Sequence, residues 1–204
     1  HDNVRFVKGR IQDLALDLNG VQHWLDAHPV RTVDDAQAFD AECERLRRDE
    51  TMIESDSVDA VVSNCVLNLV RTEQKAKLFG EIFRVLRRGG RAVISDIVCD
   101  ENPTDNIIND PDLWSGCIAG AFREDVFLKM FEDAGFHGVE ILARAETPWR
   151  TIDGIEFRSM TVRAFKGKQG PCLERKQAVV YTGPWKKVTD DDGHALPRGK
   201  RVAV

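Results

Sequence analysis

The sequence predicts an α/β protein whose central sheet is partly parallel and ends in an antiparallel pair of strands. Residues 58–98 read as a strand, a helix and a second strand, which is the βαβ unit of a parallel sheet with a right-handed crossover. Residues 138–146 and 156–167 read as two more strands, and their link is too short for a crossover helix, which favours antiparallel pairing at a sheet edge. The 204 residues suffice for one domain with a small appendage.

Composition narrows the class of protein. The chain is 42% hydrophobic and 31% charged with a net charge of -5, whereas nucleic-acid binding favours a basic face, so we expect no nucleic-acid partner. No run approaches the ~18–20 apolar residues of a membrane span, and the first residues carry no apolar signal region, so we expect no membrane partner and a cytoplasmic location. The five cysteines are an odd number without a CxxC pair, which predicts reduced, individually placed thiols rather than a disulfide framework or zinc finger.

The N-terminal third combines a predicted strand with an inserted helical segment. Residues 4–9, "VRFVKG", alternate apolar and basic side chains as a strand with one covered face does. Residues 19–52 are predicted as a helical insertion in a main domain that covers residues 1–168. Its main helix has acidic residues near its start and basic residues near its end, which suits the helix dipole, and Cys43 lies on its apolar side.

The central elements follow from local patterns. Residues 58–62 are β-branched enough for a buried strand. In the next helix Thr72 is the expected cap, and Gly89 and Gly90 the expected stop; its core stripe comprises Leu78, Ile82, Phe83 and Leu86. A strand over residues 91–98 and a helix over 123–134 follow, and residues 169–204 are predicted to form a small β-rich appendage.

Two cysteines occupy positions of chemical interest. The stretch "SNCVLNLV" places Cys65 directly after a hydrophobic strand, at the carboxyl end where open α/β sheets bind ligands and where a thiol is accessible. The alternative is that Cys65 is a small buried hydrophobe. Cys117 lies in "WSGCIAGAF", where small residues permit close backbone approach, and its alternative is a tightly packed helix start.

The stretches "SNCVLNL", "IFRVLRRGG" and "RAVISDIV" resemble the second half of the class I S-adenosylmethionine-dependent methyltransferase fold. "SNCVLNL" and "LWSGCIAGAF" are, in addition, similar to segments of arsenite methyltransferases, in which a cysteine at each position binds trivalent arsenic. The resemblance covers about residues 3–165. It implies a partial Rossmann-like sheet, S-adenosylmethionine as cofactor, arsenite or its thiol adduct as small-molecule substrate, and Cys65 and Cys117 as thiolate ligands at the carboxyl ends of strands.

The same resemblance assigns residues to the cofactor. Ile11 and Gln12 correspond to positions that sandwich and hydrogen-bond the adenine, and Ser63 and Asn64 to positions near the methionine portion; the alternative is that these residues only form turns. Methyl transfer from a sulfonium to a soft nucleophile requires in-line geometry and exclusion of water. We therefore assign no acid–base residue and no resident metal. Asp96, at the end of "VISD", is either a site carboxylate or a cap of the following loop.

The sequence also departs from the family. The glycine-rich cofactor loop, the acid that binds the ribose and an upstream cysteine have no counterpart in these residues, so we expect a fragment that is poorly active alone, with its third thiol ligand unassigned. We expect such a sheet to repair its edges by homodimerisation or strand swapping. Two other functions remain open: methylation of a small organic molecule with structural cysteines, and a non-catalytic binding or assembly role. Dependence on the thiols distinguishes arsenic methylation from methylation of an organic molecule. Affinity for the cofactor distinguishes both kinds of methyltransferase from a non-catalytic role.

Overall fold

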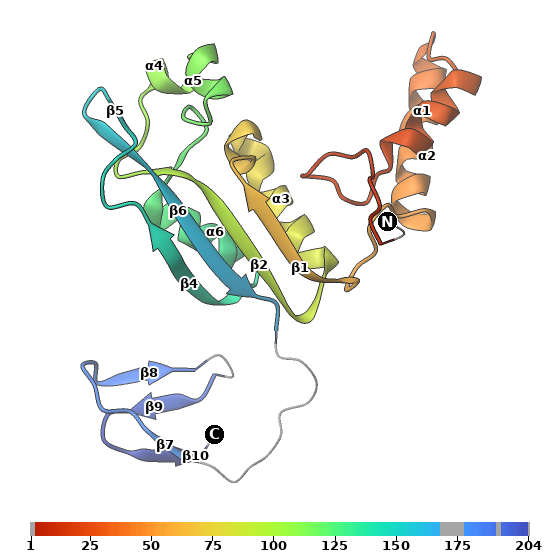
Figure 1. Ribbon diagram of the computed structural model, residues 1–204. Coiled ribbons are helices and arrows are strands. Elements are labelled where there is room, and N and C mark those ends of the chain that lie inside the picture. Colours follow the sequence, from red (N-terminus) through yellow and green to blue (C-terminus); the bar gives the residue numbers. More distant parts are fainter. Residues whose placement is uncertain (1–2, 168–177, 191–192, 204) are drawn as a thin grey trace. The chain divides into compact units, whose positions relative to one another are not determined.

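The computed structural model describes residues 3–167, 178–190 and 193–203. The chain divides into two units, residues 1–167 and 168–204, and Figure 1 shows the elements of each. None of the helices among the described residues is both long and apolar enough to cross a bilayer.

The first unit is built on a mixed sheet. Its strands follow the order β1 (Val58–Asn64), β2 (Leu86–Cys99), β6 (Ile155–Phe165) and β4 (His137–Arg144). β1 and β2 are parallel, whereas β6 is antiparallel to both β2 and β4. Two short strands complete the sheet, β3 (Phe122–Arg123) beside β2 and β5 (Arg150–Ile152) beside β6. The predicted βαβ unit and antiparallel pair are confirmed.

Two helices pack together over the sheet. These are α3 (Thr72–Val85), the crossover helix, and α6 (Glu124–Asp133). Phe79 of α3 packs edge-on against Phe127 and Phe131 of α6, with ring centroids 6.4 and 4.9 Å apart, an arrangement that aromatic pairs prefer. These side chains belong to one core cluster with the inward-facing residues of β2 and β6. The strand ends that carry the candidate site therefore rest on a packed core.

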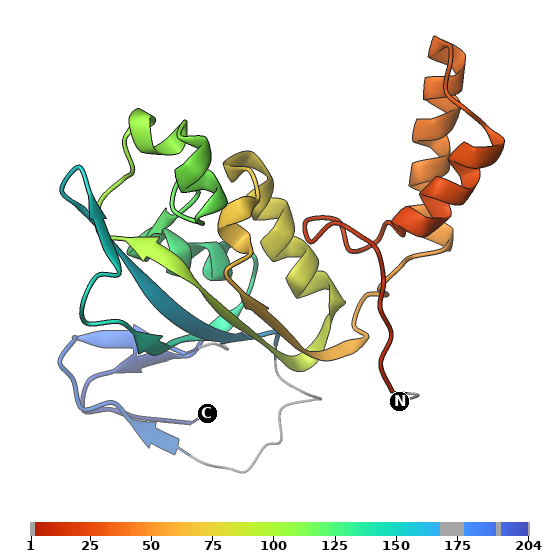
Figure 2. The ribbon, with the colours of Figure 1, turned by 45° about the horizontal axis from the view of Figure 1, so that its top comes forward.

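The inserted segment forms a helical hairpin, α1 (Leu18–Ala27) and α2 (Val33–Asp49). Thr32 and Asp35 form a capping box at the start of α2, which satisfies two otherwise free backbone donors. The hairpin buries a small cluster of its own that includes Cys43, so the expected packing role of Cys43 is confirmed. Figure 2 shows the hairpin standing beside the sheet rather than on it.

Three sequence predictions are wrong. Residues 4–9 form no strand, and Phe6 is 93% exposed, because a strand requires a partner edge that these residues do not find. Thr72 is the first helical residue, and Arg71 occupies the cap position without a side-chain bond. The helix ends at Val85, so that Gly89 and Gly90 lie within β2.

The two glycines serve a close approach of chains rather than a helix end. Gly89 adopts φ +79° and donates a 2.7 Å backbone hydrogen bond to Lys166. A side chain at Gly90 would lie 2.8 Å from the carbonyl oxygen of Arg87. Glycine is the residue that tolerates both demands.

Among its described residues the second unit contains short antiparallel ladders. β7 (Ala178–Val180) pairs with β10 (Arg201–Ala203), and β8 (Lys187–Thr189) pairs with β9 (Ala195–Pro197). This is the β-rich character expected for the C-terminal appendage.

Candidate functional site

Cys65 occupies a tight turn at the carboxyl end of β1. Its backbone N–H donates to the carbonyl of Ser95 at 2.9 Å, which extends the β1–β2 ladder by one residue. Its φ is +52°, a left-handed conformation that costs a residue with a side chain roughly 1–2 kcal/mol. The side chain is exposed, and Sγ lies 3.5 Å from Oδ1 of Asn64. The strained turn therefore presents the thiol at the sheet end instead of packing it in the core.

Cys117 lies in the turn that follows α5 (Pro111–Ser115), where it also adopts a left-handed conformation, with φ +61°. Its Sγ donates to the carbonyl oxygen of Cys65 at 3.3 Å, although the residues are 52 positions apart in sequence. The structure thus brings the two predicted cysteines together. It corrects one detail implied by the resemblance, because only Cys65 comes from a strand end; Cys117 comes from the turn after α5, where the sequence predicts a loop and a short helix.

Asp96 is a buried carboxylate whose charge acts on both thiols. It is 2% exposed, and its carboxylate accepts hydrogen bonds from the backbone N–H groups of Leu67 at 2.9 Å and Ile97 at 2.8 Å. Burial raises the pKa of this carboxyl group. Of the two roles considered from the sequence, the contacts favour the structural one, in which Asp96 caps the backbone that follows Cys65.

Both thiols are held in their protonated form at neutral pH. Partial burial of the otherwise exposed thiol raises the pKa of Cys65, and the negative charge of Asp96 raises it further. The same two causes, with a contribution from Cys65, raise the pKa of Cys117. A thiol of this kind is a weak nucleophile at neutral pH, but it remains able to exchange its proton for a thiophilic atom.

The other cysteines lie away from this pair. Cys99 is fully buried, and burial raises its pKa to about 12. Cys43 is buried inside the helical hairpin. Cys172 lies outside the described residues.

Three of the four predicted cofactor residues line one cavity. Ile11, Ser63 and Asn64 surround a volume of about 440 Å³ along β1 and its flanking loops. Most of the remaining lining is apolar, and Val62 is 75% exposed. The Ser63 hydroxyl oxygen is buried without a hydrogen-bond partner among the described residues, and such an orphaned group fits a ligand that brings a polar atom. The residues present therefore fit part of a ligand with mixed polar and apolar surface.

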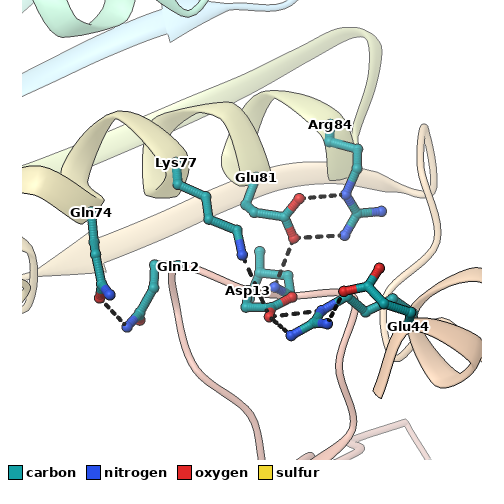
Figure 3. Close-up of polar contacts among 9 residues, drawn as sticks. Gln12, Asp13, Glu44, Gln74, Lys77, Glu81 and Arg84 are labelled. Atoms are coloured by element: carbon teal, nitrogen blue, oxygen red, sulfur yellow. Dashed lines mark hydrogen bonds and ion pairs between the residues drawn. The ribbon is translucent and has the colours of Figure 1, made fainter. Parts of the chain in front are cut away.

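Gln12, the fourth residue, is held by α3 instead. Its side-chain Nε2 donates to Oε1 of Gln74 at 3.0 Å, and Figure 3 shows this contact beside the ion pair of Asp13 with Lys77. The backbone N–H of Leu14 donates to Glu81 at 2.7 Å. The segment that carries Ile11 and Gln12 is thus fixed on α3, and Gln12 is not among the residues that line the cavity.

Sequence reasoning missed two buried polar residues at the site. Asn68, on the 3-10 helix Leu67–Leu69, is 1% exposed. Lys75 of α3 is equally buried. A signal existed for the lysine, because Lys75 falls in register with the core residues Leu78, Phe79 and Ile82, where an apolar side chain is expected.

Comparisons with known proteins identify the family. A family model described as a methyltransferase domain matches residues 37–135, and another described as a domain of unknown function (DUF8838) matches residues 168–204. The arsenite methyltransferase of Halobacterium salinarum is 42% identical over 95 residues, which are 47% of this chain and 24% of that protein. The arsenite methyltransferase of Mus musculus is 30% identical over 165 residues, which are 76% of this chain and 43% of that protein.

A solved structure agrees with the sequence comparisons. The crystal structure of an arsenic(III) S-adenosylmethionine methyltransferase from Chlamydomonas reinhardtii has a TM-score of 0.52 and 29% identity, covering 76% of this chain and 56% of that chain. This chain spans less than half the length of the two curated relatives above. The chain is an arsenite methyltransferase-like member of the class I S-adenosylmethionine-dependent methyltransferase family.

Proposed function

We propose that Cys65 and Cys117 bind trivalent arsenic for methyl transfer from S-adenosylmethionine. The observation that supports this most is the 3.3 Å contact of Cys117 Sγ with the carbonyl oxygen of Cys65, since it brings the Cys117 thiol to the backbone of the second cysteine. Trivalent arsenic is soft, and thiolate sulfur is its natural ligand by the rule that matches soft ions with soft donors.

The binding step balances without an external base. Each thiol sulfur forms a bond to arsenic while one As–O bond of arsenous acid breaks, and the thiol proton leaves with the released hydroxide as water. Because the pKa values of both thiols are raised, they enter this condensation as neutral groups, and no charge is buried. Arsenic keeps its lone pair, which is the nucleophile.

Bound S-adenosylmethionine supplies an electrophilic methyl group. Ile11, Ser63 and Asn64 line the cavity next to Cys65 and would bind the cofactor there. Ser63 offers its unpaired hydroxyl group. Asn64 directly precedes Cys65 in the sequence. The role of these residues is to orient the cofactor toward the arsenic and to exclude water, because methyl transfer depends on positioning more than on proton transfer.

Two alternatives make different use of the same residues. A methyltransferase of a small organic molecule would need the cysteines only for packing, but the exposure of Cys65 and the left-handed backbone at both positions disfavour that role. A non-catalytic binding fragment would bind arsenic but not S-adenosylmethionine. Because the chain spans less than half the length of curated relatives, ligand binding tests the proposal more directly than turnover.

The experiment is a titration with phenylarsine oxide, a trivalent arsenical that is retained by paired thiols, followed by counting of free thiols. It uses a Cys172→Ser background. We expect one equivalent to remove two accessible thiols, and Cys65→Ser or Cys117→Ser to weaken binding at least about tenfold by the loss of chelation. Cys43→Ser is the matched control and should bind normally. Equal binding by all variants would refute the arsenic site.

A further inference from the structure

The turn that carries Cys117 is held at the sheet end by the β3–β2 backbone ladder, which begins at Phe122, and by side chains. Among the described residues, the backbone N–H groups of residues 117, 118, 119 and 121 donate to carbonyl groups within residues 113–118. These bonds shape the turn but do not tie it to the strand that carries Cys65. The relative position of the two thiols therefore depends on other contacts.

Asn68 supplies one such contact. Its side-chain Nδ2 donates to the carbonyl oxygen of Ile97 at 2.7 Å and to that of Cys117 at 3.0 Å. Asn68 follows Cys65 by one turn of chain, and its predecessor Leu67 is held by Asp96. One amide thus joins the chain after β1, the end of β2 and the Cys117 turn.

Lys75 supplies the second contact, from α3. Its buried ammonium group donates to the carbonyl oxygen of Gly120 and lies 4.0 Å from the ring centroid of Phe122. Burying a charged group without a salt-bridge partner in contact is costly, and here burial lowers the pKa of Lys75 to about 8. An apolar residue in this stripe of the helix would avoid that cost. We therefore expect the ammonium group of Lys75 to make a structural contact that an apolar side chain cannot make.

Gly120 shows how closely these parts approach one another. A Cβ atom there would collide with the backbone oxygen of Asn68 and would lie 2.8 Å from the indole ring of Trp114. The segment after Cys117 therefore sits directly on the chain after Cys65, and any side chain at this position would push them apart.

We infer that Asn68 and Lys75 are positioning residues, which clamp the Cys117 turn onto the end of β1 and so set the spacing of the two thiols. The use of this spacing for arsenic rests on the proposed function, whereas the clamp itself does not. Neither residue touches the reacting atoms in this account. Both act through the backbone that carries Cys117.

The test measures thiol spacing without arsenic. A bifunctional thiol-alkylating reagent that bridges two nearby cysteines is applied to the full chain in a Cys172→Ser background, and the bridged product is compared with single alkylation by iodoacetamide. We expect the ratio of bridging to single alkylation to fall at least about fivefold in Asn68→Ala and in Lys75→Met, because the freed turn samples many positions. Asn109→Ala and Lys129→Met are matched controls, since these exposed residues bond only within their own helical turn or cap.

Each outcome decides the inference. Lys75→Met keeps an apolar stem, so it gives the answer if Asn68→Ala fails to fold. A ratio that stays within about twofold of the parent in the folded variants would overturn the clamp, as would failure of the parent to bridge Cys65 with Cys117. If the parent bridges and the variants do not, while phenylarsine oxide fails to bind the parent, the clamp stands and the proposed function falls.

Discussion

Cys117 Sγ donates a hydrogen bond to the carbonyl oxygen of Cys65, and this contact joins two left-handed turns. Non-glycine residues persist in this conformation only where the surroundings determine it, and such residues gather at functional sites. Asn68, Lys75 and Asp96 are buried polar residues whose hydrogen bonds reach the segments that carry the two turns. The geometry of the thiol pair is therefore imposed by the fold and is not a result of local sequence preference.

The backbone strain predicts an unusual stability effect. Cys65→Gly and Cys117→Gly should each be more stable than the matching alanine variant by about 0.5–1 kcal/mol, because glycine relieves the left-handed strain but gains entropy when unfolded. Urea unfolding under reducing conditions measures the difference. Val66, at φ -121°, is the control position. There the glycine variant should be less stable than the alanine variant. Glycine variants that are the less stable at both cysteine positions would contradict the strain.

The charge of Asp96 predicts the reactivity of the thiols. Its negative charge contributes to the raised pKa of Cys65 and Cys117, so Asp96→Asn should lower both pKa values and increase alkylation by iodoacetamide at neutral pH. Peptide mass spectrometry across pH 7–11 measures each midpoint. Asp105→Asn, an exposed acid on α4 (Asp105–Ile108), should leave the midpoints unchanged. If the titration midpoints of both thiols in Asp96→Asn are equal to or higher than those of the parent, burial alone raises these pKa values.

Lys75 predicts a pH-dependent stability. Its pKa is about 8 when folded, below the ordinary value of 10.5, so the unfolded chain binds more protons between these values. The free-energy cost of burying the charged ammonium group is therefore complete below about pH 8. It is relieved as the pH rises toward 10.5, which stabilises the folded chain by as much as about 3 kcal/mol. Urea unfolding of the parent and Lys75→Met at pH 7, 8, 9 and 10 should show the parent gaining stability relative to the variant. A constant difference would mean that the ammonium group is not desolvated.

Ser63 predicts an effect on cofactor binding. Its buried hydroxyl group lines the cavity beside β1 and has no partner among the described residues, so a bound cofactor would satisfy it. Ser63→Ala should weaken binding of S-adenosylhomocysteine about fivefold, the value of one ordinary hydrogen bond. Equilibrium dialysis gives the affinity, and Ser57→Ala, whose hydroxyl group bonds to Glu54 at 2.7 Å, is the control. Unchanged affinity in Ser63→Ala would remove this residue from the proposed cofactor site.

Elements with strong local periodicity were predictable from the sequence. The β-branched run of β1 and the apolar stripe of α3 each follow from neighbours within a few positions. Residues 4–9 have the alternation of a strand, but pairing depends on a distant edge that alternation does not encode. Gly89 and Gly90 were misread because glycine marks both helix ends and close chain approach, and only the contact with Lys166 distinguishes them.

The candidate site likewise combines features that nearby residues predict with features that depend on distant contacts. Cys65 was predictable because it directly follows a strand. The clamp was not, because Asn68 bonds Ile97 and Cys117 at separations of 29 and 49 residues, and Lys75 bonds Gly120 at a separation of 45 residues. In each case the acceptor is a backbone carbonyl group, which every residue carries, so the sequence of the acceptor gives no signal.

The most direct test of the proposed arsenic site is arsenic K-edge X-ray absorption of the reduced chain loaded with one equivalent of arsenite, in the Cys172→Ser background. Two sulfur atoms and one oxygen atom should surround the arsenic in the parent, and one sulfur atom should be lost in Cys65→Ser and in Cys117→Ser. An oxygen-only shell in the parent, or a sulfur count that neither substitution changes, would contradict the assignment of Cys65 and Cys117 as arsenic ligands.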